Sequence, residues 1–229
     1  MKRVLAAELL DTDSGTAREV ADSLADLRTF NRHFGGVRAM SALLGEVAKQ
    51  RGLRQMSWLD VAGGAGDVAT LTRQALQRRG IALDPVVLDR AASHLHSNGS
   101  QVNVCGDALA LPFRDNSFDV VGSSLFVHHL RVEELLCFAA EGLRVARHAF
   151  VINDLVRHPL HLALSYAAMP LYRSRLTRHD APASVRQAYT VAEMRDVLGR
   201  AGAAEISIET FYLFRMGVTL WKAPAPSLT

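Results

Sequence analysis

A cluster of glycines behind an acidic residue is the feature of this sequence that most clearly indicates chemistry. Residues 59–67 read LDVAGGAGD, so an apolar run ends in Asp60 and is followed by a glycine-rich turn. Glycines accept positive φ angles and allow close approach to the backbone, and free N–H groups open the helix expected next. The pattern predicts a strand that turns into a helix beside a nucleotide-like cofactor.

The glycine turn also satisfies the dinucleotide fingerprint Gly-x-Gly-x-x-Ala, read as GAGDVA at residues 64–69. Asp89 follows about twenty residues downstream, as that fingerprint requires. Alone, this motif is a weak signal, since a glycine turn that binds nothing and, less often, a nicotinamide dehydrogenase also have it.

Three acids change this interpretation, because Asp60, Asp89 and Asp107 each follow an expected strand. Ligands of open parallel sheets bind beyond the carboxyl ends of the strands, so all three side chains are expected on one rim. One carboxylate can hold a charged amino group, one the ribose hydroxyls and one the adenine amine. Together they indicate an adenosyl amino acid rather than a dinucleotide.

Hydrophobic periodicity predicts the elements that position this rim. Helices over residues 17–30 and 37–50 precede a strand at 57–61 and a helix at 67–79. The alternation continues with strands at 85–89, 101–104, 118–125 and 149–153, and with helices at 90–96 and 132–146. An α/β domain with a parallel sheet follows from this order.

The alternation of strands and helices stops after the fifth strand. Residues 158–172 predict an apolar helix, and the polar run 173–184 predicts a loop that completes a cap. Thr190 and Glu193 have capping-box spacing, which predicts a helix ending near Gly202. Two further strands are expected on either side of residues 212–216.

The composition indicates one stable globular domain, since 49% of the 229 residues are hydrophobic and 21% are charged. The net charge of +3 is scattered, which argues against a nucleic-acid partner. Cys105 and Cys137 lack metal-type or disulfide spacing, so a reducing, cytoplasmic setting is expected. No apolar run approaches the ~20 residues of a membrane span, so no stable membrane insertion is predicted.

The ordered motifs resemble the class I S-adenosylmethionine-dependent methyltransferases, in their methyltransferase-11 and quinone-methyltransferase-like branch. They are LDVAGGAGD at 59–67, VLD at 87–89, GDALALPF at 106–113 and NSFDVV at 116–121. The resemblance implies a Rossmann-like, seven-stranded, mostly parallel sheet with an antiparallel last strand and helices on both faces. It also implies a single domain over 1–229, with an N-terminal helical lid (1–52) and a helical cap insertion (155–190).

The same resemblance implies S-adenosyl-L-methionine as the cofactor. Asp60 and Gly64 are expected near its methionine portion, Asp89 at the ribose, and Asp107 with Ala108 at the adenine. The complete predicted set is Asp60, Ala62, Gly63, Gly64, Gly66, Asp89, Arg90, Asp107, Ala108, Leu109, Ser123 and Ser124. Ala62 replaces the usual first glycine, as in the quinone C-methyltransferase branch with its similar AGGTGD turn.

A histidine pair after the fourth strand is the predicted reacting centre. His128 and His129 follow Ser123 and Ser124 in the segment SSLFVHHL. Imidazole can accept a proton near neutral pH, and a carboxylate on its other nitrogen fixes the tautomer. Asp154 ends the adjacent fifth strand and is the predicted orienting group. Alternatively, the pair only packs beneath the cofactor.

For other residues whose side chains could bind a ligand or a metal, simpler structural interpretations are available. The apolar helix within 158–172 either roofs the acceptor pocket, packs in the core or touches a membrane surface. Asn153, Asp154 and Asp180 offer the oxygens that magnesium prefers, but we predict no metal. His158 and His161 are expected in solvated loops. Aromatic residues within 30–35 either shield the reaction as part of the lid or form a structural cluster.

The predicted reaction is O-methylation of a hydroxyl, phenolic by preference, on a small hydrophobic or polyketide-like metabolite. C-methylation of a quinone-like ring is the alternative, although the FGLRN segment of that branch is missing. An NAD(P)-dependent reductase is disfavoured because no Tyr-x-x-x-Lys pair occurs. A non-catalytic cofactor-binding partner protein also remains. The sequence leaves the oligomeric state open and is compatible with a homodimer.

Overall fold

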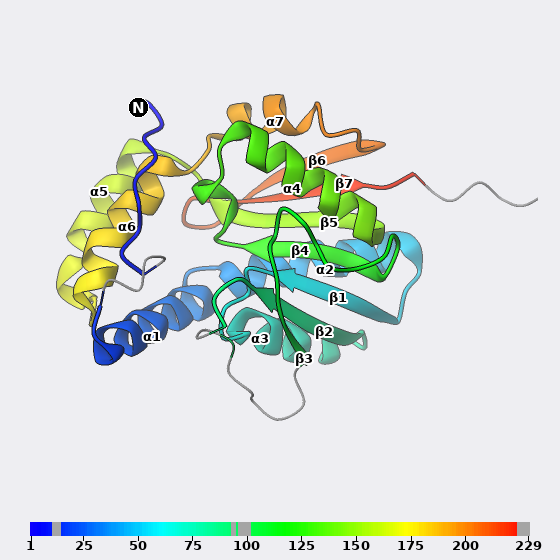
Figure 1. The fold of residues 1–229 in the computed structure, drawn as a ribbon, viewed down its shortest axis with the longest axis horizontal. Coiled ribbons are helices and arrows are strands. Elements are labelled where there is room, and N and C mark those ends of the chain that lie inside the picture. Colours follow the sequence, from blue (N-terminus) through cyan, green and yellow to red (C-terminus); the bar gives the residue numbers. More distant parts are fainter. Residues whose placement is uncertain (11–14, 93–94, 96–101, 224–229) are drawn as a thin grey trace, which may run out of the picture.

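A single seven-stranded sheet forms the centre of the protein (Figure 1). The computed structural model describes residues 1–10, 15–92, 95 and 102–223. The strand order is β3-β2-β1-β4-β5-β7-β6, and β7 is antiparallel to both of its neighbours. The strands are β1 (Gln55–Val61), β2 (Ala82–Asp89), β3 (Val102–Cys105), β4 (Phe118–Ser124), β5 (Ala146–Leu155), β6 (Glu205–Phe211) and β7 (Arg215–Trp221). The chain therefore has the predicted Rossmann-like fold with an antiparallel last strand.

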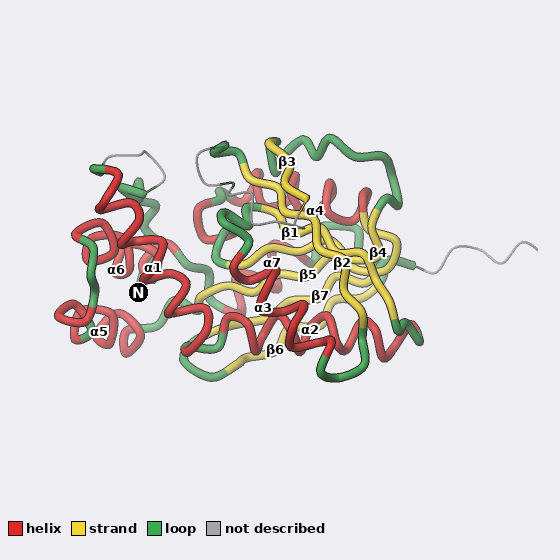
Figure 2. Tube along the Cα trace, turned by 90° about the horizontal axis from the view of Figure 1, so that it is seen from below, coloured by secondary structure: helices red, strands yellow, loops and turns green. Residues whose placement is uncertain are grey.

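Helices cover both faces of the sheet and also extend beyond one end of it (Figures 1 and 2). One face carries α2 (Gly36–Arg51) and α3 (Asp67–Gln77), and the other carries α4 (Val132–Val145) and α7 (Val191–Leu198). The extension consists of α1 (Ala17–His33), α5 (Pro159–Ala167) and α6 (Arg175–Gln187), with the short 3-10 turn Met169–Leu171.

Alternation along the strands sends side chains into two separate cores. Trp58 and Val151 lie in the core beneath α2 and α3, whereas Leu59 and Ile152 lie in the core beneath α4. All four side chains have 0% exposure. Because a one-residue slip would exchange these faces, the register of β1 and β5 is strongly specified. The carboxyl ends of the parallel strands are thereby aligned at one rim.

Most predicted elements are confirmed, with bounds that shift by a few residues. The Thr190 capping box is present, with Thr190 Oγ1 accepting from the Glu193 backbone N–H. Of the predicted helix at 90–96, residues 93, 94 and 96 lie outside the described residues. Residues 90–92, which are described, are not helical.

The prediction of a loop at 173–184 is wrong, because α6 spans most of it. Ser174 caps the helix by accepting from the Leu176 N–H, and Leu176 and Val185 are buried on its inner face. The remaining side chains of this stretch are mostly polar, so its apolar stripe was too narrow for periodicity to reveal. His161 likewise lies within α5 and is half-buried, so its expected position in a solvated loop is wrong.

Lid and cap helices are joined by buried polar contacts. The Asp26 carboxylate of α1 accepts hydrogen bonds from the backbone N–H groups of Arg173 and Ser174. Thr177 Oγ1 of α6 donates to Ser23 Oγ of α1 at 3.1 Å. The helices α1 and α6 are therefore linked by polar contacts.

Residues 1–10 form neither helix nor strand and run along α6 (Figure 1). Val4 N–H donates to the Arg186 carbonyl, and the N–H groups of Leu9 and Leu10 donate to the Asp180 carboxylate. We refer to residues 1–10 as the N-terminal strap.

Candidate active site

The turn after β1 has the backbone that the glycine pattern predicts. Ala62, Gly64 and Gly66 all have positive φ, at 56°, 53° and 73°. Gly66 is the N-cap residue of α3, so the first N–H groups of this helix face the rim. Ala62 tolerates the left-handed region despite its Cβ, which shows that the departure from glycine leaves the turn intact.

Gly63 is required for a different reason, since a Cβ at this position would lie 2.9 Å from Asp60 Oδ2 and from Val87 Cγ1. Gly64 instead has open space around it. Its backbone N–H donates to Asp89 Oδ2 at 2.8 Å, which ties the turn to the end of β2. The glycine turn and the second predicted acid therefore form one connected loop.

Asp60 is the most unusual carboxylate of the rim. It is 1% exposed, and neither of its oxygens has a hydrogen-bond partner within the described part of the chain. Burial, with a smaller contribution from the charge of Asp89, raises the pKa of Asp60 to about 8. A cationic amino group brought to this carboxylate would restore its charged form. The side chain thus fits the ammonium of S-adenosylmethionine.

The other residues that are predicted to bind the methyl donor lie along the same rim. Asp89 Oδ1 also accepts from the Ala91 N–H, and Arg90 next to it is exposed. Asp107 is exposed, and its Oδ1 accepts from the Leu109 N–H at 2.9 Å. Ala108 is buried in the core beneath α4. The Asp107 carboxylate thus holds the backbone of this loop, and the two residues that follow it, Ala108 and Leu109, have apolar side chains.

Ser123 and Ser124 end β4 with different surroundings. Ser123 Oγ is fully buried and has no hydrogen-bond partner among the described residues. Ser124 Oγ accepts from Asn153 Nδ2 of the neighbouring strand at 3.2 Å. Asn153 Nδ2 also donates to the Gly36 carbonyl, so the rim is linked to the start of α2.

His128 and Asp154 meet as the sequence predicts. The structure places His128 in the 3-10 turn Val127–His129 after β4, with His128 Nδ1 2.7 Å from Asp154 Oδ1. Its backbone N–H donates to Asp154 Oδ2 at 3.1 Å. Both side chains are buried, at 3% and 1% exposure. The bond at Nδ1 leaves Nε2 as the nitrogen that faces away from the sheet.

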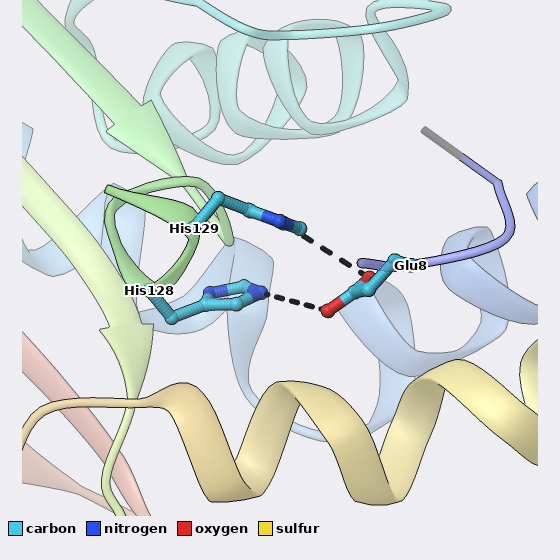
Figure 3. A group of neighbouring side chains, drawn as sticks. All are labelled: Glu8, His128 and His129. Atoms are coloured by element: carbon cyan, nitrogen blue, oxygen red, sulfur yellow. Dashed lines mark ion pairs between the residues drawn. The ribbon is translucent and has the colours of Figure 1, made fainter. Parts of the chain in front are cut away.

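Glu8 of the strap faces that second nitrogen, a contact that the sequence did not predict. Its Oε1 lies 3.6 Å from His128 Nε2, and its Oε2 lies 4.0 Å from His129 Nε2 (Figure 3). The two imidazole rings are 4.1 Å apart at their centroids and tilted by 34°. No spacing rule connects Glu8 with the histidine pair. The only signal was an isolated acid within an otherwise apolar N-terminal run.

The charges of this group are strongly coupled. Burial lowers the pKa of His128, but the carboxylates of Asp154 and Glu8 outweigh burial and raise it to about 10. Burial raises the pKa values of Asp154 and Glu8, yet His128 brings both below their ordinary values. In this conformation His128 is an imidazolium between two carboxylates.

The strap is fixed over this group by Arg3. Its guanidinium donates to the carbonyls of Gln187, His128 and Leu130, at 2.6, 2.9 and 2.7 Å. It also lies 3.7 Å from the centre of the Tyr189 ring. Cation–π contact and carbonyl bonds together hold the strap against the turn that carries both histidines.

Among the described residues, Glu8, His128 and His129 have the ligand types of a metal site, with donor atoms within 4.8 Å of one another. Ser184 and Gln187 of α6 already donate to Glu8 Oε1. We therefore interpret the group as a hydrogen-bonded ion cluster. Asp180, the distant member of the magnesium alternative, is occupied by the strap N–H groups and by His179.

Aromatic contacts connect the lid with the cap. Phe30 makes edge contacts with Phe34, at a centroid distance of 5.6 Å, and with Tyr172, at 5.4 Å. His158 and His161 both stack on Phe214, which follows β6. Phe30 of α1 and Phe34, which follows it, thus form an aromatic cluster with Tyr172, a packing that is compatible with both the lid and the structural interpretation.

Comparisons with known proteins agree with this geometry. A family model described as a methyltransferase domain matches residues 59–149. The C-methyltransferase UbiE of ubiquinone/menaquinone biosynthesis from Dinoroseobacter shibae is 34% identical over 133 residues, covering 55% of this chain and 50% of that protein. The chain thus spans about half the length of this curated relative.

Solved structures support the fold at low sequence identity. The plantazolicin methyltransferase BpumL, in complex with a monoazolic desmethylPZN analog and SAH, has a TM-score of 0.65 at 14% identity, covering 89% and 90% of the two chains. Human N-acetylserotonin methyltransferase in complex with SAM has a TM-score of 0.58 at 13% identity, covering 86% of this chain and 55% of that one.

Among the described residues, no helix combines the length and apolar character that a membrane crossing requires. The chain is thus similar to methyltransferase domains over residues 59–149, and it shares the fold of solved S-adenosylmethionine-dependent methyltransferases.

Proposed function

We propose that this protein transfers the methyl group of S-adenosylmethionine to an acidic oxygen, a phenolic hydroxyl by preference, of a small apolar metabolite. Polyketide-like products of secondary metabolism are acceptors of this kind. The observation that carries the proposal is the buried pair of His128 and Asp154 at the carboxyl ends of β4 and β5. Ligands of such sheets bind at this rim.

The donor is proposed to lie over the turn after β1. Asp60 would hold its ammonium group, Asp89 its ribose hydroxyls, and the loop of Asp107, Ala108 and Leu109 its adenine. Two features support this arrangement: Asp60 is buried without a partner among the described residues, and Gly64 leaves open space above the turn. Gly63 and Gly66 shape the turn, while Ala62, Arg90, Ser123 and Ser124 would border the donor.

When bound, S-adenosylmethionine supplies an electrophilic methyl carbon on a positively charged sulfur. His128 would take the proton of the acceptor hydroxyl at Nε2, while Asp154 holds Nδ1 and stabilises the imidazolium. His129, half-buried beside it, would border the acceptor oxygen. The protein's main contribution is then to align acceptor oxygen, methyl carbon and sulfur, and to exclude water.

Glu8 influences proton transfer to His128. Against the opposite effect of burial, Asp154 and, to a smaller extent, Glu8 raise the pKa of His128 to about 10, which favours its protonated form in the described conformation. Withdrawal of the Glu8 carboxylate would lower this pKa, while Asp154 stays in place. We expect displacement of the strap to favour deprotonation of an acceptor.

C-methylation of a quinone-like ring is the second candidate, and the 34% identity to UbiE supports it. Carbon acceptors of this type are activated through a neighbouring ring hydroxyl, so the same histidine would serve. The distinguishing property is the atom that carries the new methyl group, which mass fragmentation identifies.

Two experiments test the proposal. Melting curves with S-adenosylmethionine or S-adenosylhomocysteine, compared with NAD and NADP, identify the donor class. A ligand at about 100 times its Kd stabilises the native state by about 2.7 kcal/mol. A panel of phenols, carboxylic acids and quinols with mass detection then identifies the acceptor atom. Stabilisation by NAD or NADP alone would contradict the proposal.

A further inference from the structure

The Glu8 carboxylate lies at a point where four side-chain groups converge. Ser184 Oγ and Gln187 Nε2 donate to its Oε1 at 2.5 and 2.6 Å. His128 Nε2 lies 3.6 Å from the same oxygen, and His129 Nε2 lies 4.0 Å from Oε2 (Figure 3). Glu8 is 8% exposed. A carboxylate thus fills a small, buried and donor-rich site.

The four groups belong to the body of the fold and do not depend on Glu8 for their positions. His128 is fixed by two bonds to Asp154. Gln187 is 1% exposed at the end of α6, and the Asp180 carbonyl, 2.9 Å from Ser184 Oγ, is the alternative acceptor for the single proton of that hydroxyl. Glu8 arrives instead on the strap, which has no secondary structure. Among the residues of this group, Glu8 is thus the member that comes from the strap, and the others come from α6 and from the turn after β4.

The charge pattern of this site matches the proposed reaction. An acceptor hydroxyl that has lost its proton to His128 leaves an oxygen anion beside an imidazolium. The carboxylate of Glu8 and the imidazolium of His128 have the same charges at the same place. Hydrogen-bond donors around the oxygen favour ionisation of the acceptor hydroxyl, the step in which this charge forms, and the charge then falls again as the oxygen attacks the methyl carbon.

We propose that Ser184, Gln187, His128 and His129 form an oxyanion subsite for the acceptor, and that Glu8 occupies this subsite until an acceptor displaces it. The ligand class is an organic molecule with an ionisable oxygen, either a carboxylic acid or a phenol. The proposal rests on the proposed function for its role in catalysis. Its binding chemistry can be tested without the methyl donor.

The occupied state makes a quantitative demand on any ligand. The tethered Glu8 carboxylate competes with a free ligand at an effective concentration in the mM range. The apparent Kd of the free ligand is therefore its intrinsic Kd divided by the fraction of molecules in which the site is open. Removing the Glu8 carboxylate opens the site and should expose its intrinsic affinity. Glu8→Ala removes the occupant, and Glu8→Gln keeps its shape while removing the charge.

The experiment is isothermal titration of benzoate, and separately of phenol, into wild type, Glu8→Ala and Glu8→Gln in a buffer containing EDTA. Glu133→Ala is the matched control, because Glu133 is an exposed acid on α4. We expect benzoate, phenol or both to bind Glu8→Ala about tenfold more tightly than wild type, from the population argument. Glu8→Gln should show a smaller gain, and Glu133→Ala none.

A second variant pair locates the binding. Adding Gln187→Leu or Ser184→Ala to Glu8→Ala should abolish the gain, while melting curves monitor folding of each variant. A gain with benzoate alone identifies carboxylic acids as the ligand class, and a gain with phenol alone identifies phenols. The proposal is overturned if neither ligand gains affinity, if the gain survives both second-site changes, or if it vanishes with EDTA.

The experiments distinguish failure of the oxyanion subsite from failure of the proposed methyl transfer. Benzoate or phenol binding by Glu8→Ala with no binding of S-adenosylhomocysteine would support the subsite and refute the methyl-transfer proposal. Binding of S-adenosylhomocysteine without any gain for benzoate or phenol would do the reverse.

Discussion

Asp154 contacts His128 at two points. One carboxylate oxygen lies 2.7 Å from the ring Nδ1, and the other accepts a hydrogen bond from the backbone N–H at 3.1 Å. This double contact fixes both the ring and the turn that carries it. Asp154 lies on β5 and His128 in the turn that follows the adjacent parallel strand β4, so the contact depends on the sheet order. Asp154 is therefore a positioning residue for His128.

Replacing Asp154 with Asn tests this positioning role. Asparagine keeps the shape but removes the charge that raises the pKa of His128, so we expect kcat to fall by about 10²–10⁴, as for loss of general acid–base catalysis. The apparent pKa of the pH–rate profile should fall as well, which a merely structural defect would not produce. Affinity for S-adenosylhomocysteine, measured as the control, should stay within about twofold of wild type.

The stability of the ligand-free protein should fall as the pH rises. The pKa of His128 is raised from 6.5 to about 10, so its stabilising contribution is complete below pH 6.5 and disappears as the pH rises through 10. Asp154, Glu8 and His129 face it, and Asp60, with a raised pKa of about 8, acts in the same direction.

Urea unfolding at pH 7, 8 and 9 measures this dependence. The free energy of unfolding of wild type should decrease across the series, and His128→Gln should show a flatter curve. Equal slopes for the two proteins would show that His128 is not the protonated partner of both carboxylates.

Gly64 and Gly80 both have positive φ, so alanine variants at these two positions distinguish an effect on binding of the methyl donor from an effect on stability. Gly64 has φ +53° and Gly80 has φ +76°, and a Cβ on either would meet nothing within 4 Å. Alanine at each position should cost about 1–2 kcal/mol of stability for the left-handed backbone. Only Gly64→Ala should also weaken binding of S-adenosylhomocysteine, because the proposed donor lies over that turn. Equal affinities in the two variants would place the donor elsewhere.

The strap should loosen when Arg3 is removed. Arg3 donates three hydrogen bonds to carbonyls and lies over the Tyr189 ring, so Arg3→Ala forfeits contacts worth about 1–3 kcal/mol. Amide hydrogen exchange in residues 4–10 should accelerate by about fivefold to a hundredfold, the equivalent of that free energy. Lys2→Ala, a change at an exposed neighbour, should leave exchange unaltered. Unchanged exchange in Arg3→Ala would mean that other contacts hold the strap.

Local patterns predicted the donor side of the site because each feature there is local. Strand, acid and glycine turn are consecutive in the sequence, and parallel strands bring their ends to one rim. The meeting of His128 with Asp154 also followed from this rule, since β4 and β5 are neighbours.

The contacts around Glu8 could not be predicted in the same way. They join the strap to Asp180, Ser184 and Gln187 of α6, which lie far away in the sequence. Neither the strap nor α6 has a repeating pattern that specifies such a contact. The polar surface of α6 concealed a helix, and Glu8 had no neighbour in the sequence to mark it as part of a site.

The most direct test of the account is calorimetric titration of S-adenosylhomocysteine into wild type, Asp60→Asn and Asp84→Asn. Asp60 is the buried, unpartnered acid proposed to hold the donor ammonium, whereas Asp84 is an exposed acid on β2. We predict binding by wild type and Asp84→Asn, and a loss of about tenfold to a hundredfold in Asp60→Asn, as for a hydrogen bond to a charged group. No binding by wild type, or equal binding by all three proteins, would contradict the account.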